Sequence, residues 1–362
     1  MLVGAAGAAL LPGLCARAAG ALPAPWGRTG RVHGRRPLRL VTFERAGRRG
    51  ERLGAHLPDA AEPGVIVDLG RALALGRGAG DGADAEAEAG LPCEPLAFLR
   101  AGPAAQDAAR DALAFVTAAL GRGDEERLAR AGALVAPSQA ILHAPVPRPG
   151  KILGVARNYA AHAREQGRAA PPEEPVLFLK ASSAVIGPGA EILLPAASRQ
   201  VDYEGELAVV VGAPARQVPV ANALAYVAGY TAANDVSARD YQDARGQRFI
   251  GKSCDTFAPL GPALVTADEI PDPQKLALTT RVTGELLQVA STADMIFSVA
   301  EILCFASNLM TLEPGDVILT GTPAGVGRAR RPPRWLRDGD LVEVSVERVG
   351  TLRNRVRAAP AQ

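Results

Sequence analysis

Residues 201–212, VDYEGELAVVVG, combine a strand-like apolar run with two carboxylates, Glu204 and Glu206. Side chains two positions apart in a strand share a face, so both carboxylates point the same way. Gly205 between them removes bulk from the opposite face. An edge strand facing water would also explain the pair, but Ala208 continues the carboxylate face with an apolar residue. We therefore expect a buried strand whose two carboxylates form the floor of a pocket.

Two like charges on a buried face must stay solvated, share a proton or hold a cation. Asp235, at the end of the strand-like stretch GYTAAND (229–235), is the candidate for a third carboxylate. Three carboxylates with open remaining positions suit a hard divalent ion, and Mg²⁺, Mn²⁺ and Ca²⁺ all meet that description. Histidines number only four, which argues against a zinc site built on three of them. Spacing along the chain leaves open whether Asp235 meets Glu204 and Glu206.

The composition bounds the fold class and the partners. The 362-residue chain is 48% apolar, which suffices for a large core, and it has 39 glycines and 29 prolines, which favour many turns and short strands. The predicted fold class is therefore α+β, dominated by β-structure. The net charge of +2 gives no field for a nucleic-acid partner. No apolar run is long enough to span a bilayer, so no membrane partner is expected either.

The N-terminal segment has the composition of a targeting sequence. Residues 1–43 hold six arginines and no acidic residue, and they are rich in Ala, Leu and Gly. This pattern is typical of a mitochondrial transit peptide, and a disordered basic tail is the alternative. We assign residues 1–37 to this leader, which would direct the protein to the mitochondrial matrix.

Two folded domains are expected after the leader. Residues 38–145 are predicted to form a small α+β domain, in which strand-like stretches at 38–44 and 64–70 are joined by a turn and followed by a helix at 104–120. Three prolines in residues 143–151 mark the boundary. Residues 146–358 then form the larger, metal-binding catalytic domain, with strands, short peripheral helices and a terminal hairpin.

A short helix in the larger domain carries a possible acid–base pair. The stretch NYAAHAREQG (158–167) places His162 and Glu165 three residues apart, on one helix face, with Asn158 as the N-cap. A carboxylate beside a histidine orients the ring and raises its basicity, as a general base requires. A surface helix whose two polar side chains merely face water explains the same residues.

Three further stretches offer polar groups for an anionic ligand. Arg239 and Gln242 share a helix face just after Asp235, and Lys252 follows in a Gly-Lys-Ser turn. Beside a metal ion, these groups suit an α-keto carboxylate or an enolate. The stretch GQRFIGKS (246–253) matches a phosphate-loop pattern, but no buried strand precedes it and no helix follows. The glycine-rich stretch TGTPAGVG (320–327) is expected to present backbone amides and the Thr322 hydroxyl to an anionic group.

Taken in order, these motifs resemble those of the fumarylacetoacetate hydrolase family, over about residues 145–357. The matching stretches are NYAAHAREQ, EPVLFLKASSAVIGP, VDYEGELAVVVG, NDVSARDYQ, GKSCDTFAPLGPALV, VTGELLQ and LEPGDVILTGTPAGVG. The resemblance implies a mixed β-roll catalytic domain and a homodimer. It also implies Mg²⁺ held by Glu204, Glu206 and Asp235, a His162–Glu165 dyad on a mobile lid, and a substrate site formed by Arg239, Gln242, Lys180, Lys252 and Thr322. The chain departs from the family pattern at Ala156, Arg248 and Cys254.

The resemblance is strongest to a mitochondrial branch of the family, and it implies a small dicarbonyl acid as substrate. A metal that chelates the carboxylate and keto oxygens stabilises the enolate formed when a neighbouring bond breaks. Three reactions can pass through such an enolate, and we expect keto–enol tautomerisation of oxaloacetate. The alternatives are C–C hydrolysis of an acylpyruvate or fumarylacetoacetate-type substrate, decarboxylation of oxaloacetate, and a catalytically weak, metal-binding dimer.

Overall fold

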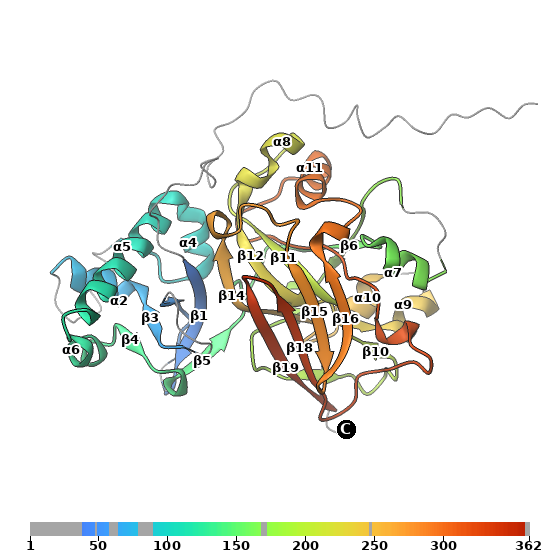
Figure 1. Cartoon of the computed structure of the whole chain (residues 1–362), viewed down its shortest axis with the longest axis horizontal. Coiled ribbons are helices and arrows are strands. Elements are labelled where there is room, and N and C mark those ends of the chain that lie inside the picture. Colours follow the sequence, from blue (N-terminus) through green and yellow to red (C-terminus); the bar gives the residue numbers. More distant parts are fainter. Residues whose placement is uncertain are drawn as a thin grey trace, which may run out of the picture.

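The computed structural model describes residues 38–47, 49–57, 64–78, 90–167, 172–245 and 248–358. The predicted leader at 1–37 lies outside these residues. β-Strands dominate, and most helices lie at the periphery (Figure 1). No helix in the described ranges has the length and apolar character needed to cross a membrane.

The N-terminal strands differ in one respect from the sequence prediction. β1 (Arg39–Arg45) and β3 (Ile66–Asp68) form as expected, but the segment between them contains a further strand, β2 (Arg52–His56). The prediction of a simple turn was wrong. β2 contains a glycine and no β-branched residue, so its intrinsic strand propensity is low. Its pairing with β1 on one side and β3 on the other supplies the missing stability.

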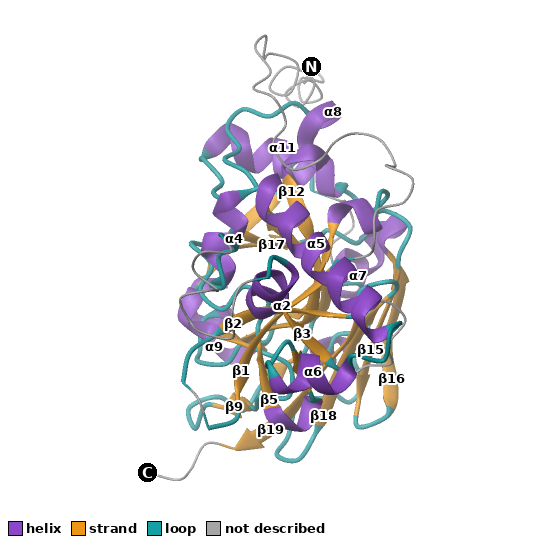
Figure 2. Ribbon diagram, turned by 90° about the vertical axis from the view of Figure 1, so that its left-hand side faces the viewer, coloured by secondary structure: helices purple, strands orange, loops and turns teal. Residues whose placement is uncertain are grey.

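Helices cover the N-terminal strands. α2 (Leu69–Gly76) begins at Asp68, whose side chain accepts a hydrogen bond from Arg71 N. The predicted long helix is α5 (Pro103–Leu120), and α6 (Glu125–Arg130) follows it. Seen from this end of the molecule, α2, α5 and α6 lie in front of the strands (Figure 2).

One long sheet joins the N-terminal strands to the rest of the chain. β1 pairs antiparallel with β14 (Ala258–Thr266), with Leu40 opposite Leu264. The path of the sheet is β4-β3-β2-β1-β14-β12-β11-β17-β6-β7. Its members not yet located are β4 (Leu134–Val135), β12 (Val227–Asn234), β11 (Gly205–Val211), β17 (Val317–Leu319), β6 (Ile152–Ala156) and β7 (Val176–Lys180). The proposed division at residue 145/146 therefore lies between segments that share a continuous sheet.

A second sheet of five strands packs against this one. Its order is β16 (Glu285–Ser291), β15 (Ala277–Val282), β18 (Leu341–Val346), β19 (Gly350–Ala358) and β9 (Ile192–Leu194). The predicted terminal hairpin is β18–β19. The two sheets meet closely at Gly205, where an added Cβ would overlap Thr280 Oγ1 and lie 3.2 Å from Val344 Cγ1. The two sheets with their few covering helices form the β-dominated α+β fold that the sequence predicts.

The opening stretch of sequence forms the centre of the long sheet. β11 lies between β12 and β17 and is buried along its whole length. It is therefore not an edge strand facing water, and its carboxylates sit on a buried face. Three short helices lie near the strand ends that carry these carboxylates. They are α7 (Ala160–Glu165), α9 (Arg239–Arg245) and α10 (Arg248–Lys252) (Figure 1).

Candidate active site

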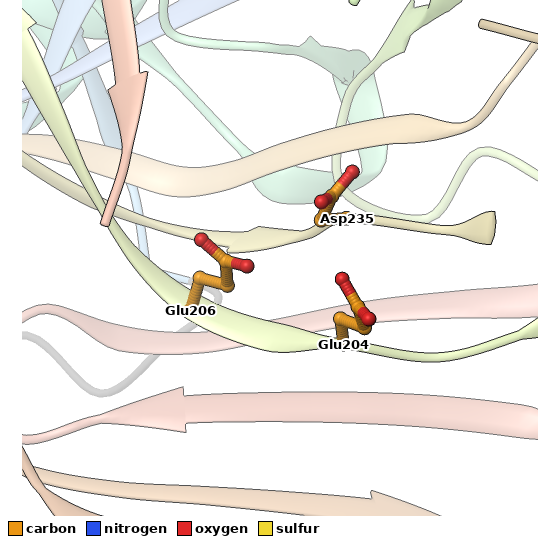
Figure 3. Close-up of side chains that lie close together, drawn as sticks. All are labelled: Glu204, Glu206 and Asp235. Atoms are coloured by element: carbon orange, nitrogen blue, oxygen red, sulfur yellow. The ribbon is translucent and has the colours of Figure 1, made fainter. Parts of the chain in front are cut away.

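Strand pairing brings the three predicted carboxylates together. Glu204 and Glu206 flank Gly205 at the start of β11, and Asp235 follows the last residue of β12. The β11–β12 register sets Gly205 opposite Asn234, and Asp235 N donates to Glu204 O at 2.8 Å. One ligand oxygen from each of the three side chains lies within 4.8 Å of the others, and all three residues are buried. Figure 3 shows the three carboxylates close together, with Glu204 and Glu206 rising from one strand.

Two buried lysines contact two of these carboxylates. Lys252 Nζ lies 2.5 Å from Glu204 Oε2 and also contacts Asp235 Oδ2. Lys180 Nζ lies 2.5 Å from Asp235 Oδ1 and donates to Val236 O at 3.1 Å. Lys252 does not lie in a turn as expected but at the end of α10, and its ammonium lies 5.1 Å from the Phe178 ring centroid.

Arg239 links the carboxylate cluster to Asp202. Its Nε donates to Asp202 Oδ2 at 2.9 Å, and its Nη2 lies 2.5 Å from Glu204 Oε1. Its Nη1 donates to Gln242 Oε1 at 3.2 Å, as the shared helix face predicted. Asp202 also accepts from Gly327 N at 2.6 Å and does not belong to the carboxylate triad.

Glu206 forms no ion pair with a cationic side chain among the described residues. Its carboxylate accepts one hydrogen bond, from Gly321 N at 2.6 Å. Burial, followed by the charges of Asp235 and Glu204, raises its pKa well above the ordinary value. By contrast, Arg239 and Lys252 outweigh the effect of burial at Glu204 and hold its pKa below the ordinary value.

The donor set fits a divalent cation. Four buried carboxylates, with Asp202 included, face three buried cations, and Glu206 is the carboxylate of this set without an ion pair to a described residue. Three converging carboxylate oxygens are the ligands that Mg²⁺, Mn²⁺ and Ca²⁺ prefer. A bound cation would favour the ionised form of Glu206, whose pKa the protein otherwise raises.

The histidine and glutamate of α7 form a hydrogen-bonded pair. His162 Nδ1 lies 2.6 Å from Glu165 Oε1, and Glu165 Oε2 accepts from Gly325 N at 2.9 Å. The other ring nitrogen, Nε2, lies 2.7 Å from Gln166 Nε2. With Nδ1–H donating to the carboxylate, Nε2 is the basic nitrogen and accepts from the Gln166 amide. Because His162 is 4% exposed, the reading of α7 as a surface helix with a solvated histidine is wrong.

Asn158 does not cap α7, contrary to the sequence prediction. The helix begins after Tyr159, and the buried Asn158 side chain donates to Phe297 O at 2.9 Å and Thr320 O at 2.8 Å. It also accepts from Phe297 N at 2.7 Å. The amide thus has long-range partners that no local pattern reveals, and it fixes the segment entering α7.

The glycine-rich loop at 320–327 binds carboxylates of the chain itself. The amides of Gly321 and Gly325 donate to Glu206 and Glu165, so the anionic groups that these two amides meet are internal. The Thr322 hydroxyl accepts from Gln288 Nε2 at 2.7 Å and donates to Gly205 O at 3.0 Å. The loop therefore joins the acid–base pair to the carboxylate triad.

One cavity of about 490 Å³ collects most of the predicted site residues. The carboxylate triad lines it, together with His162, Arg239, Gln242, Lys252 and Thr322. Glu165 and Lys180 contact residues of the lining instead. A larger cavity of about 720 Å³ between β5 (Ala140–His143) and β8 (Val185–Ile186) has mainly apolar walls. We take the smaller cavity as the active site, because the groups able to move protons or bind a cation converge there.

The sequence profile of the fumarylacetoacetate hydrolase C-terminal domain matches residues 151–357. The chain belongs to the fumarylacetoacetate hydrolase family. It is 44% identical over 268 residues to the mitochondrial oxaloacetate tautomerase FAHD2B of Bos taurus, an alignment that covers 74% of this chain and 80% of the relative. The mitochondrial oxaloacetate tautomerase FAHD2A of Homo sapiens is 42% identical over the same shares of both chains. The protein is accordingly an enzyme of this family.

Solved structures of the family share the fold. Fumarylacetoacetate hydrolase from Exiguobacterium antarcticum superposes with a TM-score of 0.67 at 34% identity, covering 89% of this chain and 100% of that one. The 5-carboxymethyl-2-hydroxymuconate delta-isomerase from Mycobacterium smegmatis gives a TM-score of 0.64 at 33% identity, with the same coverage. One fold thus carries relatives named for hydrolysis and for isomerisation.

The sequence reasoning did not assign Gln166 or Arg157 to this cavity. Gln166 lies one helical turn after His162, and that i,i+4 spacing could have revealed it. Arg157 also lines the cavity, and no spacing signal marks it. Arg248, noted only as a departure from the family pattern, lines the cavity as well. Cys254 does not: its thiol lies 3.9 Å from Ile250 O.

Proposed function

We propose that the protein catalyses keto–enol tautomerisation of oxaloacetate. The observation that carries the proposal is the placement of the His162–Glu165 pair and the Glu204–Glu206–Asp235 triad around one cavity. A proton-transferring base beside a cation site is what enolisation next to a carbonyl requires. Relatives that are 42–44% identical and named oxaloacetate tautomerases support the choice of substrate.

Glu204, Glu206 and Asp235 hold the metal in this proposal, with Mg²⁺ as the first choice and Mn²⁺ or Ca²⁺ as alternatives. A divalent ion there would supply Lewis-acid chemistry, which polarises a carbonyl group and favours its enolate. The uncompensated Glu206 carboxylate supports this assignment.

The chain's own residues move the protons. In the keto-to-enol direction, His162 Nε2 takes a proton from C3 of the substrate, and the Glu165 carboxylate stabilises the resulting imidazolium. The Lys252 ammonium donates a proton to the enolate oxygen, and exchange with solvent restores both groups. Gln166 must release Nε2 before the ring can act. The substrate is positioned around these groups by Arg239, Gln242 and Thr322. Lys180 acts through Asp235, the carboxylate that it contacts.

The proposal includes a location and an assembly. The relatives are named as mitochondrial, and the basic N-terminal segment supports import into the matrix. A homodimer is supported by the exposed apolar side chains of Leu286 and Val289 on the edge strand β16. Light scattering on the purified protein should give twice the mass of one chain.

Hydrolysis of an acylpyruvate is the second candidate, because a structural relative is named fumarylacetoacetate hydrolase. It would use the same site, with His162 activating a water that attacks the acyl carbonyl; the C–C bond then breaks, and the enolate of pyruvate that leaves is protonated on carbon. Decarboxylation of oxaloacetate would break the bond between C3 and the neighbouring carboxylate in the keto form, which releases CO₂ and leaves the enolate of pyruvate.

One assay series separates these reactions. Enol-oxaloacetate is mixed with the purified protein, and the loss of enol absorbance is followed with and without chelator, then after adding back Mg²⁺, Mn²⁺ or Ca²⁺. Acetylpyruvate cleavage and CO₂ release are measured on the same samples. We expect metal-dependent tautomerisation to be the fastest reaction. Faster acetylpyruvate cleavage would favour the hydrolase, and no turnover of any substrate would leave a metal-binding dimer.

A further inference from the structure

Arg157 occupies a strained backbone position at the edge of the cavity. It follows the last residue of β6 and has a φ of 59°, a conformation that L residues other than Gly, Asn and Asp rarely adopt. Such strain persists where the surroundings dictate the backbone and often marks a functional position.

The residues on both sides of Arg157 explain why the position cannot relax. Ala156 pairs with Val176 of β7, and the next residue, Asn158, is held by three long-range hydrogen bonds. The Asn158 Cβ lies 2.7 Å from where a Cβ on Gly321 would stand, so the loops are packed closely. The backbone on both sides therefore fixes the position of the Arg157 Cα.

The guanidinium of Arg157 has no partner in the part of the chain that the structure describes. Its Nε is buried without a hydrogen bond. The other cations of the site differ. Lys180, Lys252 and Arg239 all contact carboxylates, so their charges are already neutralised within the protein.

A buried N–H donor without an acceptor is costly, and the cost is recovered when a ligand supplies the acceptor. A planar guanidinium matches a carboxylate with two parallel hydrogen bonds. Arg157 lines the same cavity as His162 and the carboxylate triad, so a ligand bound there can reach it. Arg248 and Arg328 line that cavity too.

We propose that Arg157 binds the second carboxylate of the substrate, the one that is not beside the keto group. This inference rests on the proposed function and deepens it, because it makes the site selective for dicarboxylates over keto acids with a single carboxylate. Arg157 is then a specificity-determining residue that takes no part in proton transfer.

The positive φ of Arg157 allows substitutions that remove the cation without destabilising the fold, so a loss of binding in these variants cannot be explained by misfolding. Arg157→Gly and Arg157→Asn remove the cation and suit a positive φ better than Arg does, so both variants should be at least as stable as the wild type. Arg157→Lys keeps a charge but loses the planar fork. Arg164→Gln removes one charge from the exposed side of α7 and serves as the matched control.

The binding probes are L-malate and L-lactate, which differ by the second carboxylate and cannot enolise. Dissociation constants are measured by calorimetry on the full chain loaded with Mg²⁺. We expect the wild type and Arg164→Gln to bind malate at least tenfold more tightly than lactate. In Arg157→Gly and Arg157→Asn the two constants should become similar through weaker malate binding, and Arg157→Lys should fall between.

The same variants are then assayed with oxaloacetate, where KM should rise tenfold or more with kcat changed less than threefold. An unchanged malate-to-lactate ratio in Arg157→Gly would overturn the inference even if the enzyme tautomerises oxaloacetate. A collapsed ratio in an enzyme that does not tautomerise oxaloacetate would overturn the proposed function and keep the inference. Equal weakening of malate and lactate would also contradict the inference, since it would indicate a general loss of the site.

Discussion

The backbone amide of Gly325 donates a hydrogen bond of 2.9 Å to Glu165 Oε2, which ties the loop at 320–327 to α7. The same carboxylate holds His162 Nδ1 through its other oxygen. One side chain therefore sets both the orientation of the base and the distance between the helix and the loop. Four predictions concern this arrangement and the fold that supports it.

Glu165→Gln should lower kcat for oxaloacetate tautomerisation by about 10²–10³, with little change in KM, because an uncharged amide neither stabilises the imidazolium nor accepts from both neighbours. Steady-state rates of the purified variant check this. Glu173→Gln, an exposed acid outside the cavity, is the control. A kcat equal to that of the wild type would remove Glu165 from the mechanism.

Glu204→Gln and Glu206→Gln should have opposite effects on stability. Glu204 pairs with Arg239 and Lys252, so its neutralisation should cost on the order of 3 kcal/mol of unfolding free energy. Glu206 has no ion pair in the described ranges, so its neutralisation should stabilise the chelator-treated protein by about 1 kcal/mol.

Urea unfolding in the presence of chelator measures both values, and Mg²⁺ titration calorimetry should show affinity at least about tenfold weaker in each variant. A loss of stability in Glu206→Gln, or wild-type Mg²⁺ affinity in either protein, would contradict the assignment.

Gly205→Ala should lower the unfolding free energy by about 1–3 kcal/mol, since the new methyl group overlaps Thr280 Oγ1 between the two sheets. Thr280→Ala removes that atom, so the double variant should recover most of the loss. Thermal and urea unfolding of the wild type, the two single variants and the double variant complete this double-mutant cycle. Additive losses in the double variant would show that the close contact is not the cause.

His56 should make the protein less stable as the pH falls. Burial, and then the charge of Arg39, lower the pKa of His56 from 6.5, so the folded protein keeps the ring neutral where the unfolded chain takes up a proton. The free energy of unfolding is therefore highest above pH 6.5. It decreases as the pH falls from there through the lower pKa of the folded state. Unfolding free energies of wild type and His56→Gln at pH 7.5 and 5.5 test this, and equal differences in the two proteins would refute it.

Sequence reasoning reached the parts of the site that depend on local periodicity. Alternation along a strand placed Glu204 and Glu206 on one face, and helical spacing placed His162 beside Glu165. The approach of Asp235 depends on the pairing register of two strands, so a single sequence can suggest this contact but cannot establish it. The family resemblance supplied Lys180, which no local pattern placed near the cluster.

Other features depend on partners far along the chain, and these were missed. Asn158 looks like a helix cap, yet its amide bonds to residues more than a hundred positions away. β2 has weak intrinsic propensity and forms because two neighbours pair with it. The strain and the unpaired donor of Arg157 exist only in three dimensions.

The pairing of β1 with β14 covers an edge of β14 that would otherwise be open to pairing with another strand. Without that cover, one side of β14 would present unpaired amides and carbonyls next to the apolar residues Leu264 and Val265. An uncovered edge of this kind recruits strands from other molecules. β1 therefore covers a strand edge through which β14 could otherwise pair with a strand of another molecule.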